Sequence, residues 1–319
     1  MNYRQALAIM ALSVAVMTTL TVAQNSSSLS AQGRGISNRG LVSHGPQGVS
    51  GLTFTLIDYP GAIAEQFPFG INDSGKIAGY YNLPDGTARS YLLQGKAFKD
   101  VVFPGAAVTL AFGINKSGTV VGTYSPTTSS LDSHGFTFKG TSYKSFDFPG
   151  STYTNPYNIN VSGDIVGIYA NADMVAHAFL LHKGTFTSFD APFGQVLTAP
   201  YAINKKGTIV GIYQLPQDGT NHGFILDNGT YTQVDFPGAV STDLNGINDS
   251  GDIVGDYTSD GSTYHCFLLR AGTFTSFDVP FPGSALNGAT GINNNGQIIG
   301  TYGANDNTTF YSFGFLTSH

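Results

Sequence analysis

Short runs of β-forming residues return along the chain at a regular interval. One run is Ile165-Val166-Gly167-Ile168-Tyr169, in which apolar β-branched residues flank a central Gly. A second run covers residues 177–181, and a third covers residues 186–190, where aromatic and polar residues intermix. Runs of this length, separated by turn residues such as Gly and Asn, are typical of short β-strands. The pattern therefore predicts an all-β fold.

These runs belong to one unit that occurs six times from residue 51 onward. Its marker is Gly-Ile-Asn or a close variant, and the marker asparagines are 43, 45, 44, 44 and 45 residues apart: Asn72, Asn115, Asn160, Asn204, Asn248 and Asn293. A Gly follows three residues after each marker Asn, and a Tyr ends the next run in every copy. Four short strands in about 44 residues are typical of a propeller blade. The sequence predicts a six-bladed β-propeller with four strands per blade.

The two ends of the repeat region complement each other. The last copy stops after its third strand, at residues 315–319, while residues 53–58 match the missing fourth strand. A ring in which the N-terminal strand completes the last blade leaves no sheet edge exposed. An open solenoid would instead need capping units at its ends. We therefore predict that residues 53–58 pair with the strand around residues 313–317.

The residues before the repeats predict an exported protein. Arg4 precedes an apolar run from Ala6 to Met17, and Thr21 and Ala23 suit cleavage before Gln24. Threonines interrupt this run too early for a membrane anchor, which needs about 20 apolar residues. The expected organisation is a signal peptide at 1–23, a flexible tether rich in Ser, Gly and Gln at 24–50, and the propeller at 51–319. A secreted, periplasmic or cell-surface location follows, with no membrane span in the mature chain.

Composition excludes several classes of protein. Charged residues make up 11% of the chain and aromatic residues 13%, which is the reverse of a disordered chain. A formal net charge of −6 argues against nucleic acid as a partner, because phosphate binding needs clustered Lys and Arg. The single cysteine, Cys266, cannot form an internal disulfide and stands where sibling repeats carry Gly or Ala. We interpret it as a small buried residue rather than a reactive thiol, and we expect a monomer.

The lengths of the links distinguish two faces of the predicted disc. The links between the first and second strands and between the third and fourth strands are tight, so they lie on one face. The other links are longer and variable, and function in rigid folds concentrates on such loops. We expect the ligand on this variable face. Polar residues that break the repeat there are candidate ligand contacts: Glu65 and Asp243 in the links between blades, and Arg89 at the start of a third strand.

A His begins the third strand in four repeats, with seven to nine residues between it and the Tyr that ends the second strand. Because a hairpin joins these strands, we predict four cross-strand pairs: Tyr124 with His134, Tyr169 with His177, Tyr213 with His222, and Tyr257 with His265. Each pair is either a hydrogen bond that pins the hairpin or part of a ligand-facing rim around the central funnel. The recurring Asn, Gly and Asp residues are interpreted as framework. The mid-strand Gly of each second strand is expected to permit close packing between blades.

Metal chemistry is only weakly indicated. The His residues occur once per blade and lack zinc-ligand spacing. Residues 249–252 and 305–307 are similar to calcium loops in composition alone, without the distal Glu. No catalytic or phosphate-binding motif occurs. We therefore expect no metal and no cofactor, and calcium is the weak alternative.

The segment His177-Ala178-Phe179, placed after Asn160-Val161-Ser162-Gly163 and Ile165-Val166-Gly167, resembles the HAF repeats of bacterial extracellular proteins. Related triplets begin at His134, His222 and His265. The first and last copies depart from the motif at Arg89-Ser90-Tyr91 and Phe313-Gly314-Phe315. The resemblance implies a bacterial protein that is secreted or in the cell envelope. It implies no particular activity.

Three functions fit these observations. The first is recognition of a polysaccharide or cell-surface ligand, with contacts from Glu65, Arg89, Tyr124, His134, Asp243, Tyr257 and His265. The second is a carbohydrate-active enzyme, a lyase or hydrolase. Its proton-transfer groups would be Tyr169 with His177 or Tyr213 with His222, and Arg89 would neutralise a uronate. The third is a purely structural surface repeat. Only three polar residues are singled out as breaking the repeat, which favours recognition.

Overall fold

The structure is a computed structural model that describes residues 51–59, 65–83, 85–128, 132–172, 175–193, 196–216, 219–281, 286–305 and 310–318. These residues all belong to one compact unit, which spans Gly45–His319. Every regular element in them is a β-strand, as predicted. The predicted signal peptide and tether lie outside the described residues.

Each repeat contributes an inner strand followed by strands that lie progressively farther out. The first three repeats form β2 (Gln66–Ile71), β3 (Ile77–Asn82), β4 (Ala88–Gln94), β5 (Ala97–Val101), β6 (Val108–Ile114), β7 (Val120–Ser125), β8 (His134–Lys139), β9 (Ser142–Phe146), β10 (Tyr153–Ile159), β11 (Ile165–Ala170), β12 (Ala176–His182) and β13 (Thr185–Phe189). The last three form β14 (Leu197–Ile203), β15 (Ile209–Gln214), β16 (Asn221–Asp227), β17 (Thr230–Gln233), β18 (Ser241–Ile247), β19 (Ile253–Thr258), β20 (His265–Arg270), β21 (Thr273–Phe277), β22 (Leu286–Ile292), β23 (Ile298–Asn305) and β24 (Phe310–Ser318).

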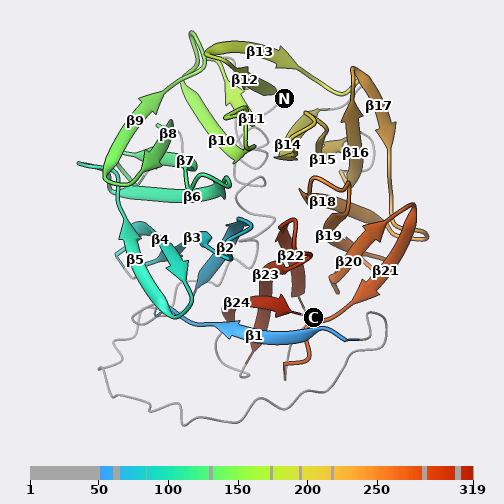
Figure 1. Cartoon of the computed structure of the whole chain (residues 1–319). Coiled ribbons are helices and arrows are strands. Elements are labelled where there is room, and N and C mark those ends of the chain that lie inside the picture. The colour runs from blue at the N-terminus through green and yellow to red at the C-terminus, as the bar shows by residue number, and fades with distance from the viewer. Residues whose placement is uncertain are drawn as a thin grey trace. The chain divides into compact units, whose positions relative to one another are not determined.

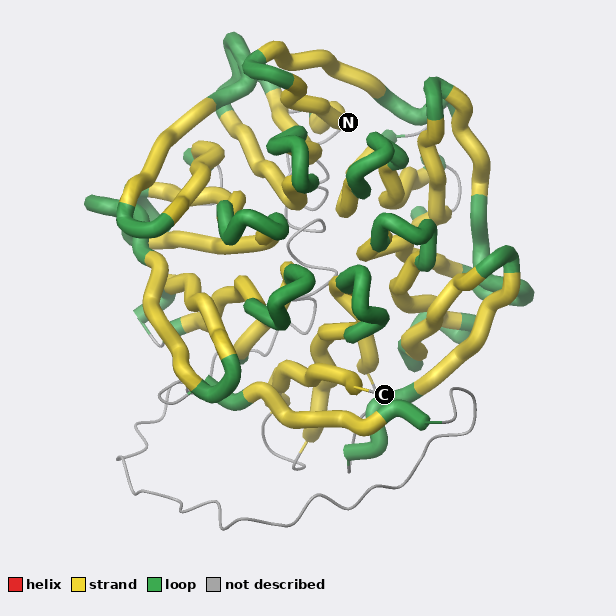
Figure 2. The backbone as a smooth tube through the Cα atoms, in the orientation of Figure 1, coloured by secondary structure: helices red, strands yellow, loops and turns green. Residues whose placement is uncertain are grey.

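The strands build a β-propeller arrangement (Figure 1). Four sheets have four strands each, and a fifth sheet has eight strands that come from repeats 1 and 2. Within every repeat the strands pair antiparallel in chain order. Repeats 1 and 2 are joined by one parallel bridge between Ala88 and Val108. The backbone tube shows the tight turns gathered on the side that faces the viewer (Figure 2).

Strand β1 (Thr53–Ile57) pairs with β24, at the opposite end of the chain. The register runs from Thr53 opposite Ser318 to Ile57 opposite Gly314. This is the strand pairing that the split repeat predicts. The sheet of repeat 6 therefore has the order β1-β24-β23-β22, with the N-terminal strand in the outer position.

The mid-strand glycines serve a different purpose from the one predicted. A Cβ on Gly122 in β7 would collide with the carbonyl oxygen of Leu110 in β6, the inner strand of the same sheet. The other members of the series would meet their own inner strands in the same way: Gly79, Gly167, Gly211, Gly255 and Gly300. Each inner strand shifts register at this level, so the glycine makes room for a β-bulge. Packing between blades is instead the role of glycines such as Gly113, where a Cβ would lie 2.9 Å from the Cα of Asn158.

Apolar side chains fill the space between neighbouring sheets. One cluster joins Ala78 and Val101 of repeat 1 to Ile114, Val120 and Phe136 of repeat 2. Another joins Phe54 of β1 to residues of repeats 5 and 6. Because each sheet buries both of its faces, the second and third strands are apolar over most of their length.

Candidate functional site

We call the side with the links between first and second strands and between third and fourth strands the tight-turn face. The opposite side, which carries the other links, is the long-loop face. The predicted Tyr–His pairs lie near the long-loop face, and their cross-strand register is confirmed: Tyr124 opposite His134, Tyr169 opposite His177, Tyr213 opposite His222 and Tyr257 opposite His265. The rings of each pair lie 5.3 to 5.5 Å apart.

A Tyr–His hydrogen bond, which was one of the two interpretations, is not how the described pairs interact. The Nδ1 atom of each His meets the Asp that follows the fourth strand: His134 with Asp147 at 3.0 Å, His177 with Asp190 at 2.7 Å, His222 with Asp235 at 3.1 Å, and His265 with Asp278 at 3.0 Å. The Asp series is therefore the partner of the His series. Where repeat 1 has Arg89 in place of His, it also has Val102 in place of Asp.

The Tyr side chains are held by other groups. The hydroxyls of Tyr124, Tyr169 and Tyr257 each bond a Ser of the fourth strand, at 2.9 to 3.0 Å. Each ring also stacks on the aromatic residue of the link from the preceding repeat. The ring centroids of Phe148 and Tyr169, for example, are 3.5 Å apart. An aromatic, Tyr, His and Asp thus form one interlocked set across two repeats. None of the four Tyr–His pairs lines the central cavity described below.

The three repeat-breaking residues do not form one site. Glu65 and Arg89 both lie at the long-loop end of repeat 1, where Glu65 accepts a 2.6 Å hydrogen bond from Asn82. The Arg89 side chain is exposed. Asp243 was predicted to lie in a link between blades, and this is wrong. It lies in β18, the inner strand of repeat 5. Asp243 is 6% exposed, and its side chain accepts from Asn221 rather than from Arg89.

Asp243 forms a buried pair with Asp256, which stands opposite it on β19. Their exposed fractions are 6% and 9%. Asn221 donates to Asp243 at 2.9 Å, and Asn245 donates to Asp256 at 2.7 Å. Burial raises the pKa of Asp243 to about 6. Burial, together with the charge of Asp243, raises the pKa of Asp256 well above its ordinary value.

The sequence contained a signal for this pair, which we missed. Only repeat 5 has a carboxylate at both of these opposed positions. The other repeats have Phe67 and Tyr80, Leu110 and Thr123, Asn155 and Ile168, Ala199 and Ile212, and Gly288 and Thr301. Comparing strands across the repeats, rather than searching the links, would have found it.

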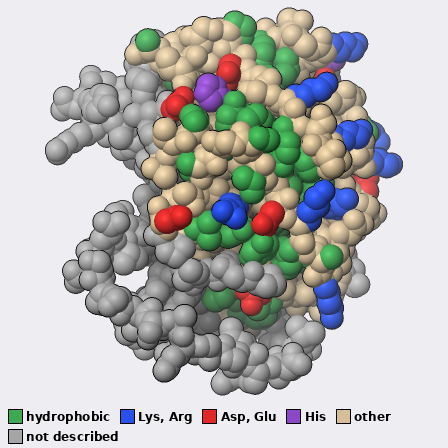
Figure 3. Space-filling view, turned by 90° about the vertical axis from the view of Figure 1, so that its left-hand side faces the viewer, with side chains coloured by type: hydrophobic (Ala, Val, Ile, Leu, Met, Phe, Trp, Pro, Cys, Tyr) green, Lys and Arg blue, Asp and Glu red, His purple; other side chains and the backbone are tan. Residues whose placement is uncertain are grey.

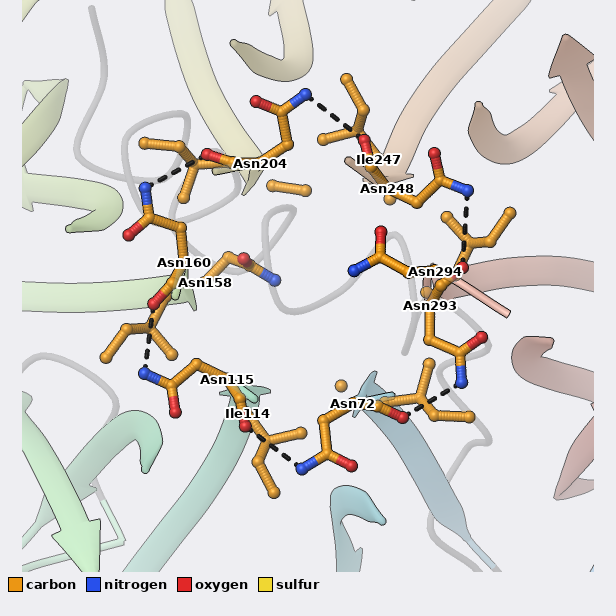
Figure 4. A pocket seen from close by; sticks show the side chains of 18 of the residues that line it. Asn72, Ile114, Asn115, Asn158, Asn160, Asn204, Ile247, Asn248, Asn293 and Asn294 are labelled. Atoms are coloured by element: carbon orange, nitrogen blue, oxygen red, sulfur yellow. Dashed lines mark hydrogen bonds between the residues drawn. The ribbon is translucent and has the colours of Figure 1, made fainter. Parts of the chain in front are cut away.

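The six marker asparagines close a ring of hydrogen bonds on the tight-turn face (Figure 4). The Nδ2 atom of each donates to the backbone oxygen of the marker Asn in the next repeat. The six distances, from Asn72 around to Asn293, are 3.1, 3.1, 3.1, 3.3, 3.4 and 3.0 Å. The last bond joins Asn293 of repeat 6 to Asn72 of repeat 1. Each Oδ1 also accepts from the amide two residues on, as the turn interpretation predicts, for example from Ser117 to Asn115 at 3.1 Å.

A central cavity of about 200 Å³ lies inside this ring. Its wall consists of the Gly-Ile-Asn segments and the residues after them, including Asp73, Lys116, Lys205 and Asp249. The side chain of Asn158 points into it (Figure 4). Asn158 stands where four repeats have Gly, and its amide makes no hydrogen bond to any described residue.

The residues directly before those glycine positions form an aromatic arc next to the cavity. Phe69, Phe112, Tyr157 and Tyr201 contact one another edge to face, with ring centroids 5.2 to 5.6 Å apart. Asn245 and Thr290 take these places in repeats 5 and 6. Asn245 is the residue that bonds Asp256, so the arc ends where the buried carboxylate pair begins. The residues at these positions beside the central cavity are therefore aromatic in repeats 1 to 4 and polar in repeats 5 and 6.

The two faces differ in charge. Most described Lys and Arg residues lie at tight turns: Lys76, Lys96, Lys116, Lys139, Lys183, Lys205, Lys206 and Arg270. Most described acidic residues lie at the long-loop ends: Asp58, Glu65, Asp85, Asp100, Asp132, Asp147, Asp190, Asp235, Asp260 and Asp278. Arg89 is the one cation among the described residues of the long-loop ends. Figure 3 shows Lys and Arg gathered along one margin of the side that carries β5 to β9.

Three further features are the single cysteine, groups that could hold a metal ion, and helices that could cross a membrane. Cys266 is completely buried, and burial raises the pKa of its thiol, as expected for a small packed residue. Among the described residues, no group of three or more His, Cys, Asp or Glu is arranged to hold a metal ion. The described residues contain no helix that is long and apolar enough to cross a membrane.

No family model and no curated protein matches this chain. Among solved structures, TolB from Acinetobacter baumannii is 12% identical with a TM-score of 0.56, over 76% of this chain and 63% of that one. AofleA from Arthrobotrys oligospora is 14% identical with a TM-score of 0.52, over 82% and 85%. A lectin from Aleuria aurantia, described as a six-bladed β-propeller with a novel fucose recognition mode, is 11% identical with a TM-score of 0.48, over 79% and 90%. At these identities the likeness is one of fold.

Proposed function

We propose that this protein is a secreted bacterial recognition propeller of the HAF-repeat type, and that it binds carbohydrate. The apolar leader at residues 6–17 and the His-Ala-Phe motif support secretion and the family. Detection of the exported protein with Gln24 as its first residue would test the leader. The binding function rests on the central cavity and has its own test below.

The proposed ring has six blades, and β1 closes it. The eight-stranded sheet supports this count, because a single bridge joins its two halves, each of which has the strand order of the other repeats. Closure is supported by the β1–β24 pairing and by hydrogen bonds from repeat 6 to repeat 1, two of which come from buried side chains. Asn293 donates to the Asn72 oxygen at 3.0 Å, and Thr290 donates to the Pro68 oxygen at 2.6 Å.

We place the carbohydrate in the central cavity of the tight-turn face rather than on the long-loop face. The Tyr, His and Asp groups of the long-loop face are already bonded to one another and to Ser. In the cavity, the Asn158 amide makes no hydrogen bond to any described residue, and it can both donate to and accept from sugar hydroxyls. This free amide is the single observation that carries the proposal.

The size and the wall of the cavity suit one sugar unit. A volume of about 200 Å³ is below the roughly 300–1,000 Å³ of pockets for drug-sized ligands. Sugars present hydroxyls around an apolar ring face, and the wall combines polar Asn and charged side chains with six Ile residues. The aromatic arc that ends at Phe69 adds apolar surface beside it.

The test is binding of the full-length protein to an array of neutral and acidic glycans, followed by Asn158→Gly. Glycine is the residue of four sister repeats, so the fold should tolerate it. Losing one or two hydrogen bonds of about 1 kcal/mol each should weaken the best glycan about tenfold. Asn228→Gly is the matched control. Asn228 lies in a tight turn of the same face, outside the cavity, with a φ of 47° that glycine also adopts.

Two outcomes would refute the proposal. The protein could bind no glycan on the array, in which case recognition of carbohydrate is wrong. Alternatively, Asn158→Gly and Asn228→Gly could both leave affinity unchanged, in which case the cavity is not the site. Melting temperatures of both variants exclude unfolding as the cause of a loss.

A further inference from the structure

Repeat 2 and the adjoining strand of repeat 1 carry a continuous line of amines, which we call the lysine strip: Lys99, Lys116 and Lys139. Lys116 lines the central cavity. The Nζ of Lys139 donates at 3.3 Å to Ser117, the residue next to Lys116. The Nζ of Lys99 donates at 3.3 Å to the oxygen of Gly140, the residue next to Lys139. The strip therefore runs from the cavity to the outer strand β5, and all three side chains are exposed.

No described carboxylate neutralises the strip. Elsewhere on the tight-turn face, Arg270 pairs with Asp252 at 2.9 Å and Lys205 with Asp249 at 3.8 Å. The position of Asp252 is occupied in repeat 2 by Thr119. The acidic residue that Lys205 meets in the next repeat corresponds to Val161 for Lys116.

The contacts of the strip leave most of its binding capacity unused. An ammonium group has three donors and no acceptor. Lys99 and Lys139 each engage one neutral oxygen with one donor. Unpaired cations that lie close together raise the local potential and attract anions. Hydrogen bonds from an ammonium to a carboxylate or sulfate are also stronger than those to a neutral oxygen.

We propose that the lysine strip binds an acidic glycan, a sugar chain with carboxylate or sulfate groups, one unit of which occupies the central cavity. This inference rests on the proposed carbohydrate-binding function and adds its substrate class. The continuity of the strip with the cavity through Lys116 favours a glycan over other polyanions, because the Asn158 amide can bond hydroxyls in the same site.

The charge of the two faces also decides whether the acidic glycan binds at the lysine strip or at Arg89. The sequence led us to expect that Arg89, on the long-loop face, would neutralise a uronate. Arg89 lies on the face that carries most of the described acidic residues, and its charge helps to lower the pKa of the nearby carboxyl of Asp85. A polyanion approaching the long-loop face meets repulsion, whereas the strip offers three cations that form no ion pair with any described carboxylate. We therefore assign the acidic glycan to the strip.

The experiment compares polygalacturonate with its carboxyl-reduced, neutral form in binding to the full-length protein. The triple variant Lys99→Gln, Lys116→Gln, Lys139→Gln is compared with a control of equal charge change, Lys76→Gln, Lys183→Gln, Lys206→Gln. We expect polygalacturonate to bind at least tenfold more tightly than the reduced polymer, and its affinity to fall as salt rises. The strip variant should lose at least tenfold and the control less than threefold. Arg89→Ala should cause no loss.

Each other outcome has a definite meaning. Equal binding of both polymers would overturn the acidic substrate class and leave the carbohydrate function intact. Binding of neither polymer, and of no glycan on the array, would refute the carbohydrate function itself. Equal losses in both triple variants would overturn the strip as the site. Binding of duplex DNA as tightly as polygalacturonate would show that any polyanion suffices and would overturn the glycan assignment.

Discussion

The two faces of this propeller are built by different means. On the tight-turn face, one Asn per repeat bonds its own turn and the next repeat, and all six copies are present. On the long-loop face, a His–Asp contact occurs in four repeats, while repeats 1 and 6 have Arg89 and Phe313 in the His position. The first device uses backbone oxygens as acceptors, so it does not depend on the neighbouring sequence. The second needs two matched side chains, and both are replaced in repeat 1.

This difference suggests where sequence change is tolerated. A side-chain pair at a half-exposed surface can be lost at small cost, because water replaces the lost partner. An Asn that satisfies several buried backbone groups cannot be replaced without leaving them unpaired. The repeated Asn thus forms the rigid frame, and residues beside it, such as Asn158 and Lys116, are free to differ.

The largest expected effect concerns strand β1, the outer strand of the sheet of repeat 6. Phe54 of β1 is 6% exposed and contacts the rings of Phe277 and Phe315. Phe54→Ala should lower the free energy of unfolding by about 3–5 kcal/mol. Leu56→Ala, on the same strand but 41% exposed, should cost less than about 1 kcal/mol. Urea unfolding measures both, and equal, small losses would mean that β1 does not complete the last sheet.

The next effect tests the Asn ring. Asn115→Ala removes the bond to the Asn160 oxygen and the acceptor for the amides of Ser117 and Thr119. Leaving these buried groups unpaired should cost about 2–4 kcal/mol. Asn115→Asp keeps the acceptor and loses only the donor, so its cost should be smaller. If Ala and Asp were equally harmful, the bond between repeats would account for the whole effect.

A third prediction uses the buried pair beneath the long-loop face. Both carboxyls have a pKa above the unfolded value of 3.8, so the folded state binds protons more readily. The stability they contribute is present below about pH 4 and is lost as pH rises, with the part due to Asp243 lost through about pH 6. Asp256→Asn should therefore raise the free energy of unfolding at pH 8 by about 1–3 kcal/mol and flatten its decline.

Asp260→Asn provides a control, because the pKa of Asp260 is shifted in the opposite direction from that of Asp256. Hydrogen bonds from the backbone amides of Thr263 and Ser262 lower the pKa of Asp260. Its contribution is present above the unfolded pKa and is lost on acidification, so this variant should not stabilise the protein at pH 8. Urea unfolding between pH 4 and 8 compares the two variants. A decline with pH that persists unchanged in Asp256→Asn would contradict the prediction.

The smallest effect compares one His on each face. His177 bonds Asp190 at 2.7 Å and lies against Tyr169, with 31% of its side chain exposed. His182 bonds Asp164 at 2.6 Å on the tight-turn face, but its side chain is 52% exposed. We expect a loss of about 1 kcal/mol for His177→Ala and less than about 0.5 kcal/mol for His182→Ala. Thermal unfolding at one pH decides this, and the reverse order would remove the framework role of the His series.

The sequence alone determined the all-β class, the repeat length, the four strands per repeat and the pairing of β1 with β24. These follow from local periodicity and from counting strands, and both are written along the chain. The cross-strand Tyr–His register was also predictable, because a short hairpin allows only one pairing of its strands.

Only the tertiary structure decided what these residues contact. The partner of His177 is Asp190 rather than Tyr169, because the fourth strand brings that carboxylate beside the ring. The Asn ring and the central cavity depend on bringing residues of all six repeats together. Asp243 meets Asp256 only once β18 and β19 pair. Contacts between strands and between repeats arise when folding brings together residues that are far apart in the sequence. A linear pattern places such residues on an element but does not state what lies across from them.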